Sequence, residues 1–65
     1  MLNLKNLKSL IAKNGFTLLE LSEASGVGLN TLNRILHGKK AQLATIGRLA
    51  NALGCEPSYL LTDKE

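Results

Sequence analysis

The sequence predicts an all-α fold in which five short helices surround one core. Apolar residues recur at the three- and four-residue spacing of a helix face along most of the chain, and no stretch alternates as a strand does. Glycines follow the apolar runs where helices should end, at Gly15, Gly26, Gly38 and Gly54. With 65 residues, 45% of them hydrophobic, the chain holds enough apolar material for one small domain.

The first expected helix lies in the opening stretch, MLNLKNLKSLIAK. One face carries Leu4, Leu7, Leu10 and Ile11, while the lysines lie off it, and Asn14-Gly15 ends the helix. An amphipathic targeting helix is the alternative, but these apolar residues fit a face that packs on a core, which we favour. No apolar run approaches the ~20 residues that span a bilayer, and the opening lacks the apolar segment of a signal peptide. We therefore expect neither export nor membrane insertion.

The second expected helix has the best-specified start in the chain. The Thr17 hydroxyl can accept from the backbone amide of Glu20, whose carboxylate can reach back to the amide of Thr17. Phe16 and Leu21 flank this capping box as a hydrophobic staple. The helix can continue only to about Ser25, because Gly26 follows it.

Three more helices are expected after the Gly26-Val27 turn. Residues 29–37 place apolar side chains on one side, Leu32, Ile35 and Leu36, and polar ones on the other, Asn30, Asn33, Arg34 and His37. The fourth helix is marked by Leu43, Ile46, Leu49, Ala50 and Leu53, and Gly54 stops it. Pro57 suits the first turn of a short last helix that contains Tyr59, Leu60 and Leu61.

The residues of the chain give little support to a catalytic or metal-binding function. The chain has one cysteine and one histidine, which excludes an intramolecular disulfide and a Cys/His set of zinc ligands within the chain. We therefore take a reducing, cytoplasmic setting as the default. Glu20 and Glu23 form a close carboxylate pair, but capping already explains Glu20. Cys55 is interpreted as a core cysteine and His37 as solvated or phosphate-contacting. We expect no enzyme, no cofactor, no metal and no small-molecule substrate.

Positive charge is concentrated in the middle of the chain. The formal net charge is +3, yet no acidic residue lies between Glu23 and Glu56, where four basic residues stand: Arg34, Lys39, Lys40 and Arg48. Such a cluster attracts an acidic partner, most commonly a phosphate backbone, and an ordinary solvated face is the alternative. The polar face of residues 29–37 favours DNA, because asparagines pair with adenine edges and arginine pairs with guanine.

The segment 16–38, FTLLELSEASGVGLNTLNRILHG, resembles the helix-turn-helix of Cro/repressor-type (XRE-like) DNA-binding domains of phages and bacteria. LATIGRLANALGCEPSYLL is similar to the fourth and fifth helices of those domains. The residues that stand at the family's positions are Thr17, Leu21, Gly26-Val27, Leu32, Ile35 and Gly38-Lys39. The resemblance implies a compact five-helix, lambda-repressor-like helix-turn-helix domain over residues 1–65, with the motif at 17–37.

The resemblance also implies which side chains contact double-stranded DNA. The third helix would enter the major groove with its base-reading residues, Leu29, Asn30, Asn33 and Arg34. Phosphates would be held by Thr17, His37, Lys39 and Lys40, and the amino end of the second helix would add its dipole. Leu29 replaces a residue that is usually polar. It would either contact thymine methyl groups or pack against the second helix.

The chain departs from the family's pattern at two positions. Leu18 stands where the family often has a glutamine that bonds a phosphate, so that contact is missing. Gly28 replaces the usual serine or threonine cap of the third helix, which weakens the cap by only a few tenths of a kcal/mol. The first departure lowers the expected affinity for DNA, and neither breaks the fold.

We therefore expect a sequence-specific transcriptional regulator, a repressor that binds a palindromic operator as a homodimer. Its dimer interface would be formed by Tyr59, Leu60 and Leu61, unless these residues close the core instead. The alternative is a protein-binding module of the same fold, such as an antitoxin or anti-repressor, that docks through Leu18, Leu19, Leu29 and Leu36. The polar ending Thr62-Asp63-Lys64-Glu65 fits either a complete protein or the first domain of a longer one.

Overall fold

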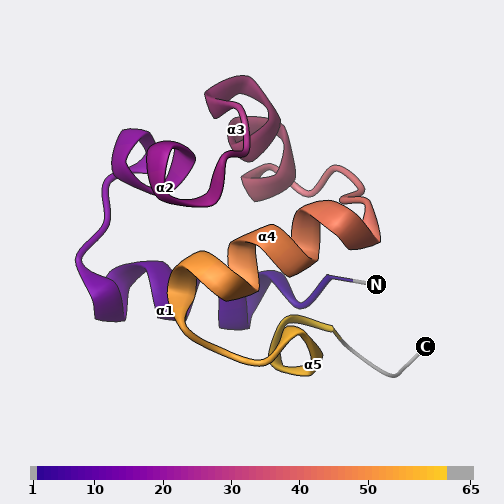
Figure 1. Ribbon diagram of the computed structural model, residues 1–65. Helices are drawn as coiled ribbons and strands as arrows, with labels where there is room; N and C mark the ends of the chain where they lie inside the picture. Colours follow the sequence, from indigo (N-terminus) through magenta and orange to yellow (C-terminus); the bar gives the residue numbers. More distant parts are fainter. Residues whose placement is uncertain (1, 62–65) are drawn as a thin grey trace.

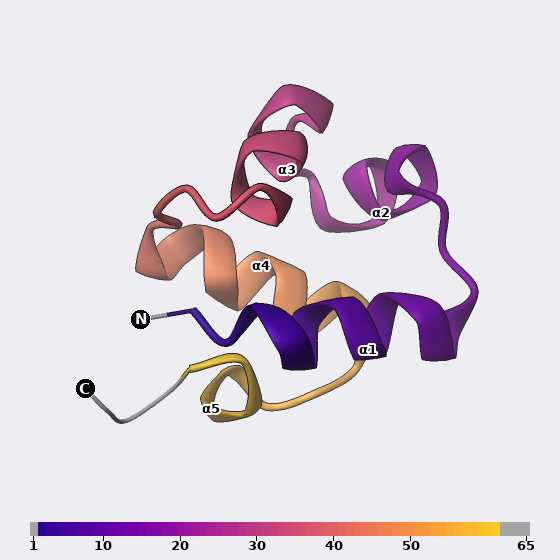
Figure 2. The ribbon, with the colours of Figure 1, turned by 180° about the vertical axis from the view of Figure 1, so that it is seen from behind.

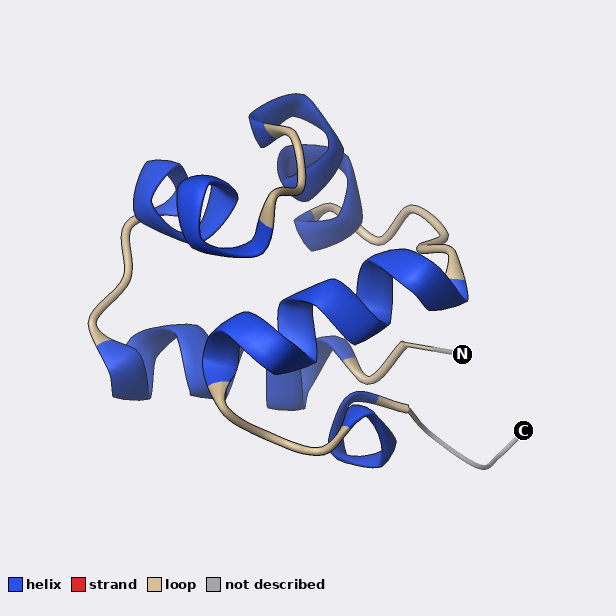
Figure 3. Ribbon diagram, viewed as in Figure 1, coloured by secondary structure: helices blue, strands red, loops and turns tan. Residues whose placement is uncertain are grey.

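Five helices make up the computed structural model, which describes residues 2–61 (Figure 1). They are α1 (Leu4–Asn14), α2 (Leu18–Ser25), α3 (Leu29–Leu36), α4 (Leu43–Leu53) and α5 (Pro57–Leu60). The expected all-α, five-helix fold is confirmed, and Figure 3 shows only helices and loops over the described part of the chain. The polar ending at residues 62–65 lies outside the described residues.

The helices lie in layers around α4. Figure 1 shows α2 and α3 together on one side of α4, and the view from behind in Figure 2 shows α1 and α5 on the other side. α4 contacts α1, α2 and α5, while α2 contacts α3. This arrangement leaves the outer sides of α2 and α3 facing away from the rest of the domain.

The core lies between these layers and is wholly apolar among the described residues. Its most deeply buried side chains come from every helix: Leu7, Leu21, Leu32, Ile35, Leu49 and Leu60. Fully burying a leucine or isoleucine contributes about 1.5–3 kcal/mol, so these six side chains dominate the stability of a domain this small. The periodic apolar faces predicted for α1 and α3 are the faces that pack here.

The start of α2 and the ends of α1, α2 and α4 are made by the residues that the sequence indicates, and Asn3 adds a cap that the sequence analysis did not predict. The capping box of α2 is complete, with the Thr17 hydroxyl accepting from the Glu20 amide at 3.1 Å and the Glu20 carboxylate accepting from the Thr17 amide at 2.9 Å. Asn3 caps α1 in a similar way, since its side-chain oxygen accepts from the Asn6 amide at 3.0 Å. α1, α2 and α4 end at glycines, as expected.

Three expectations about helix residues need correction. Leu61, predicted within the last helix, is instead the extended C-cap that follows α5. Leu43, predicted on the buried face of the fourth helix, is 74% exposed. It is the first residue of α4, and a side chain in the first turn points back beyond the helix end rather than into the core. α3 ends at Leu36, and His37 is its C-cap, so this helix is one residue shorter than predicted.

The two ends of the described chain pair with each other. Leu2 and Leu61 form an isolated antiparallel bridge, and the Asn3 amide donates to the Leu60 carbonyl at 2.6 Å. These bonds draw the last helix onto α1 and seat the Leu60 side chain in the core, where it is fully buried. The expectation that Leu60 offers its side chain to a dimer partner is therefore wrong, and the core alternative holds for it.

Candidate nucleic-acid interface

The turn between α2 and α3 is held by side chains as well as by backbone. Gly26 has a φ of +75°, a left-handed conformation that glycine adopts without steric cost. The Ser22 hydroxyl donates to the Val27 carbonyl at 2.7 Å, and the Val27 amide donates to the Ser25 hydroxyl at 3.2 Å. Because Val27 is also buried, α3 leaves the turn in a defined direction. Sequence reasoning missed the roles of both serines.

α3 presents a polar face on the side opposite its buried residues. Leu32 and Ile35 pack into the core, whereas the polar residues of the helix are exposed: Asn30, Thr31, Asn33 and Arg34. Asn30 and Arg34 are four positions apart and therefore neighbours on the helix surface. Within residues 2–61, no hydrogen bond occupies the side chains of Asn30, Asn33 or Arg34. Their donors and acceptors are free to meet base edges.

Leu29 lies at the start of α3 and is 43% exposed. Its side chain therefore keeps a large apolar surface that the domain itself does not cover. The preceding N-cap, Gly28, provides no side-chain hydrogen bond to the helix. A Cβ atom at Gly28 would meet only the Thr31 hydroxyl, at 3.8 Å, so the position has room for a capping side chain.

His37 is held at the end of α3 by its own helix. Its Nδ1 lies 2.7 Å from the Asn33 backbone carbonyl, and because a carbonyl only accepts, Nδ1 carries the hydrogen of this bond. Nε2 is the nitrogen left for a partner. It can donate to a phosphate only when the ring holds both protons, as the imidazolium cation.

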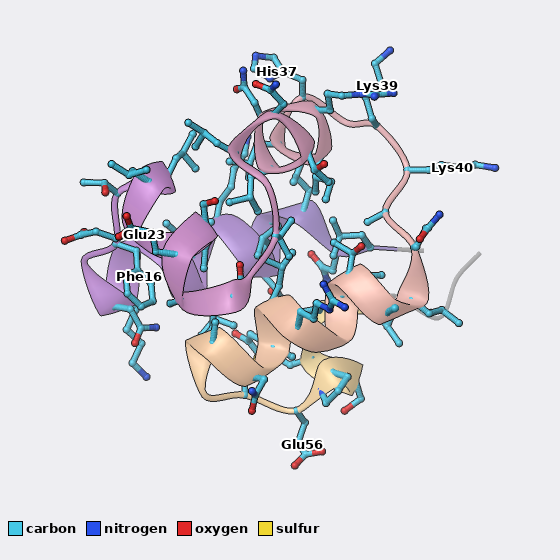
Figure 4. The ribbon with its side chains drawn as sticks, turned by 45° about the horizontal axis from the view of Figure 1, so that its top comes forward. Phe16, Glu23, His37, Lys39, Lys40 and Glu56 are labelled. Atoms are coloured by element: carbon cyan, nitrogen blue, oxygen red, sulfur yellow. The ribbon has the colours of Figure 1, made fainter. Side chains whose placement is uncertain are left out.

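The loop after α3 carries the two lysines away from the protein body. Gly38, with a φ of +92°, turns the chain, and its amide donates to the Ile35 carbonyl at 3.0 Å. The Lys39 amide donates to the Arg34 carbonyl at 3.0 Å. In Figure 4, the side chains of His37, Lys39 and Lys40 project outward from the end of α3 and the following loop. Three potentially cationic groups thus flank the polar face of α3.

Thr17 lies at the exposed start of α2, beside a carboxylate. Its hydroxyl oxygen already accepts from the Glu20 amide, which leaves the hydroxyl hydrogen available to a phosphate. The Glu20 carboxylate occupies the Thr17 amide, however, and it brings a negative charge to the same helix end. The capping box that begins α2 therefore repels a phosphate placed there.

A polar cleft that sequence reasoning missed lies between α3 and the start of α4. It has a volume of about 320 Å³ and is lined mainly by Thr31, Arg34, Lys40, Gln42 and Thr45. The described residues of its lining include two cations and no carboxylate. The three-residue spacing of Thr31 and Arg34 on one helix would have indicated part of the cleft, but only tertiary packing brings Gln42 and Thr45 beside them.

Two of the described carboxylates, those of Glu23 and Glu56, lie apart from the end of α3, whereas the Glu20 carboxylate lies beside Thr17 at the start of α2. Figure 4 places Glu56 on the side opposite His37 and Lys39, and Glu23 beside α2. The stretch without acidic residues thus folds into α3, its following loop and α4. An approaching polyanion meets positive charge at the end of α3.

Cys55 lies half-buried against the core, away from any cluster of ligands. Burial raises the pKa of its thiol, and the neighbouring Glu56 carboxylate raises it further. The reactive thiolate is thereby disfavoured. Over residues 2–61, no group of three or more histidine, cysteine, aspartate or glutamate side chains is arranged to hold a metal ion. None of the helices in that range has the length and apolar character needed to cross a membrane.

Fold and surface together define a helix-turn-helix DNA-binding domain. Residues 6–65 match the family model of the Cro/C1-type HTH DNA-binding domain, and the chain belongs to this family. The resemblance stated from the sequence is confirmed. A comparison with curated proteins found no match, and neither did a comparison with solved structures.

Proposed function

We propose that this protein is a sequence-specific transcriptional repressor that binds a palindromic operator as a homodimer, with α3 in the major groove. The observation that carries the proposal is the outer face of α3. It exposes Asn30, Asn33 and Arg34 without partners among the described residues, while Leu32 and Ile35 anchor the opposite face in the core. A rigidly seated helix with free polar groups is what reading base edges requires.

The base-reading roles follow from the chemistry of each side chain. Asn30 and Asn33 can each exchange a donor and an acceptor with an adenine, and Arg34 can donate twice to a guanine. Each such pair discriminates against the wrong base by about 1–3 kcal/mol. Leu29, with its uncovered apolar surface, would contact a thymine methyl group.

The phosphate contacts would set the position of the domain on the duplex. Lys39 and Lys40 supply charge without geometric demands, and His37, when its ring holds both protons, would add a donor from the end of α3. Thr17 would contact the backbone from α2, weakened by the Glu20 carboxylate beside it. These contacts are independent of base sequence and give the binding its dependence on salt.

The homodimer would place two α3 helices about 34 Å apart, one turn of the duplex. The described part of the domain measures 31 × 21 × 18 Å, so two copies fit side by side at this spacing. With Leu60 in the core, the interface would depend on Tyr59, which is 48% exposed, and on the half-buried Leu61. The strongly exposed Leu43 is a further apolar side chain available to a partner copy.

The proposal extends to the setting in which the protein works. A phage or bacterial regulator acts on DNA in the cytoplasm, as a single domain with no enzymatic activity, cofactor or substrate. Its proposed partners are the operator duplex and a second copy of itself.

The decisive experiment is selection of bound sequences from a random duplex pool at about 150 mM salt, where non-specific electrostatic binding is suppressed. A palindrome with two short half-sites about one turn apart is the expected result. A pool that yields no motif would overturn the operator-binding proposal.

A second candidate is a protein-binding module of the same fold, such as an antitoxin or anti-repressor. The observation that favours it is the exposure of Leu19, 57%, together with that of Leu29. Leu18 and Leu36 are half-buried and would add less to a docking surface. Salt separates the two candidates: DNA binding through six to ten phosphates weakens by about 10³–10⁵ between 50 and 200 mM, whereas apolar docking barely changes.

A further inference from the structure

A small apolar pocket lies beneath the loop that carries the two lysines. Its volume is about 260 Å³, and its apolar wall is formed by Leu2, Leu4, Ile35 and Ala41. Gly38, Lys39 and Lys40 complete the lining, and the two lysines are the charged groups among its described residues. The pocket is distinct from the polar cleft between α3 and α4, with which it shares Ile35, Lys40 and Ala41.

Backbone hydrogen bonds hold both walls of this pocket. On one side, the Asn3 amide bonds the Leu60 carbonyl at 2.6 Å and ties down the segment that carries Leu2 and Leu4. On the other side, the amides of Gly38 and Lys39 bond carbonyls of the last turn of α3. Ile35 is buried at the base of that turn. The pocket is therefore preformed and requires no rearrangement of the core.

We propose that this pocket binds a small organic acid with an apolar body, such as a medium-chain carboxylate. Its volume is slightly below the roughly 300–1,000 Å³ of pockets for drug-sized ligands, so the ligand must be smaller than those. The apolar wall accepts a hydrocarbon body. The ammonium groups of Lys39 and Lys40 project outward from the loop in Figure 4. On their flexible stems they can fold back over the mouth of the pocket, where they would select a carboxylate at the head of the ligand and disfavour an amine.

Binding of such an acid would regulate the DNA contact. Lys39 and Lys40 line the pocket and are also assigned to phosphates, so a bound carboxylate neutralises charge that the DNA backbone needs. By linkage, an acid that weakens DNA binding is itself bound more weakly by the DNA complex. The binding of the acid stands independently of DNA, whereas this regulatory consequence rests on the proposed function.

The binding is tested first without DNA, by titrating octanoate into ¹⁵N-labelled protein and following backbone amide shifts. We expect saturable shifts centred on Leu4, Ile35 and Ala41. Octylamine, which has a tail of the same length and the opposite charge, should bind at least about tenfold more weakly, because charge-assisted contacts are lost. Equal binding of the two probes, shifts centred on the exposed Leu19 and Leu29, or no saturable shift would overturn the proposal.

Two matched variants test the location of the site. Ala41→Leu fills the pocket from its wall and should weaken octanoate binding at least about tenfold. Ala44→Leu adds the same atoms at an exposed position on α4, outside the pocket lining, and should leave octanoate binding unchanged. Circular dichroism establishes that both variants are folded. If Ala41→Leu is unfolded, Lys40→Gln replaces it, with the same loss expected. Unchanged binding in the folded pocket variant would overturn the location.

The regulatory consequence is tested with the selected operator. Octanoate should release wild-type protein from DNA but leave the Ala41→Leu complex intact. If octanoate binds at the pocket and the wild-type complex persists, the coupling is wrong. If the protein fails to bind any DNA before octanoate is added, the proposed function fails, while the titration without DNA still decides the pocket.

Discussion

Glu20 and Thr17 exchange two hydrogen bonds across the first turn of α2, at 2.9 and 3.1 Å. The exchange begins the helix and also sets a carboxylate beside a residue assigned to a DNA phosphate. Under the proposed function, Glu20 would thereby stabilise the helix and at the same time lower the affinity of the domain for DNA.

Replacing Glu20 with glutamine should separate these two effects. The amide oxygen of Glu20→Gln can still accept from the Thr17 amide, so the capping box persists, but the favourable charge at the helix start is lost. We expect DNA binding to strengthen about 1.5- to 5-fold at low salt, as for an exposed charge contact, and thermal stability to fall slightly. Glu23→Gln removes an equal charge outside the capping box and should strengthen binding less. Equal effects of the two variants would show that only net charge matters.

Replacing Gly28 with serine should stabilise the domain. Gly28 is the N-cap of α3, has a φ of −59° that any residue adopts, and leaves room for a Cβ atom. A capping hydroxyl and a less flexible unfolded chain together contribute about 0.5–1 kcal/mol. The melting temperature should rise by several degrees. Gly26→Ser is the contrasting variant, because the left-handed φ of Gly26 makes a side chain cost about 1–2 kcal/mol. A lower melting temperature for Gly28→Ser would contradict the cap geometry.

Arg34 and Lys39 should differ in what they contribute to DNA binding. Arg34→Ala should cost about 1–3 kcal/mol on the operator and relax the preference at one base pair, with little effect on random DNA. Lys39→Ala should weaken all sequences alike and reduce the salt slope by about one. Binding isotherms on operator and random duplexes at several salt concentrations measure both. An equal loss on the two duplexes for Arg34→Ala would remove Arg34 from the base-reading set.

We expect the Leu29 side chain to contact the methyl group of a thymine in the operator. Replacing the contacted thymine of the operator with uracil removes one methyl group and should weaken wild-type binding by about 0.8 kcal/mol, the value of one buried methylene-sized group. The same replacement should have no effect on Leu29→Ala, because the methyl group has lost its partner. A double-mutant cycle combines wild-type or Leu29→Ala protein with the thymine or the uracil duplex, and the four affinities give the coupling energy between Leu29 and the methyl group. Zero coupling at every thymine of the half-site would favour the packing role for Leu29.

Tyr59 and Leu60 are neighbours with opposite expected phenotypes. Leu60→Ala opens a cavity in the core and should cost about 2–5 kcal/mol, enough to unfold much of a domain of this size. Tyr59→Ser should leave the melting temperature nearly unchanged while weakening dimerisation on the operator. Sedimentation with and without DNA measures assembly, and Leu43→Ser tests the other exposed apolar side chain. If Tyr59→Ser dimerises with wild-type affinity and Leu43→Ser dimerises more weakly, the dimer interface would lie at the start of α4 instead.

Much of the candidate site could be predicted because it lies within one helix. The three- and four-residue spacing of residues 29–36 separates Leu32 and Ile35 from Asn30, Asn33 and Arg34, and the structure keeps that separation. The cleft beside Arg34 could not be found in this way, because Gln42 and Thr45 reach it from another helix. Ser22 and Ser25 were missed for a related reason: their bonds follow from the path of the turn and not from a spacing pattern.

The sequence by itself determined the five helices, the capping box of α2, the glycine ends of α1, α2 and α4, and the polar face of α3, because each depends on residues no more than about four positions apart. Tertiary structure alone decided that Leu60 is buried, that Leu43 is exposed and that the lysines after α3 border an apolar pocket. These outcomes depend on how the N-terminal segment, α3 and α4 meet. Whether a side chain is buried depends on which elements pack against it. The local spacing of apolar residues cannot predict which turns of a helix extend beyond the core.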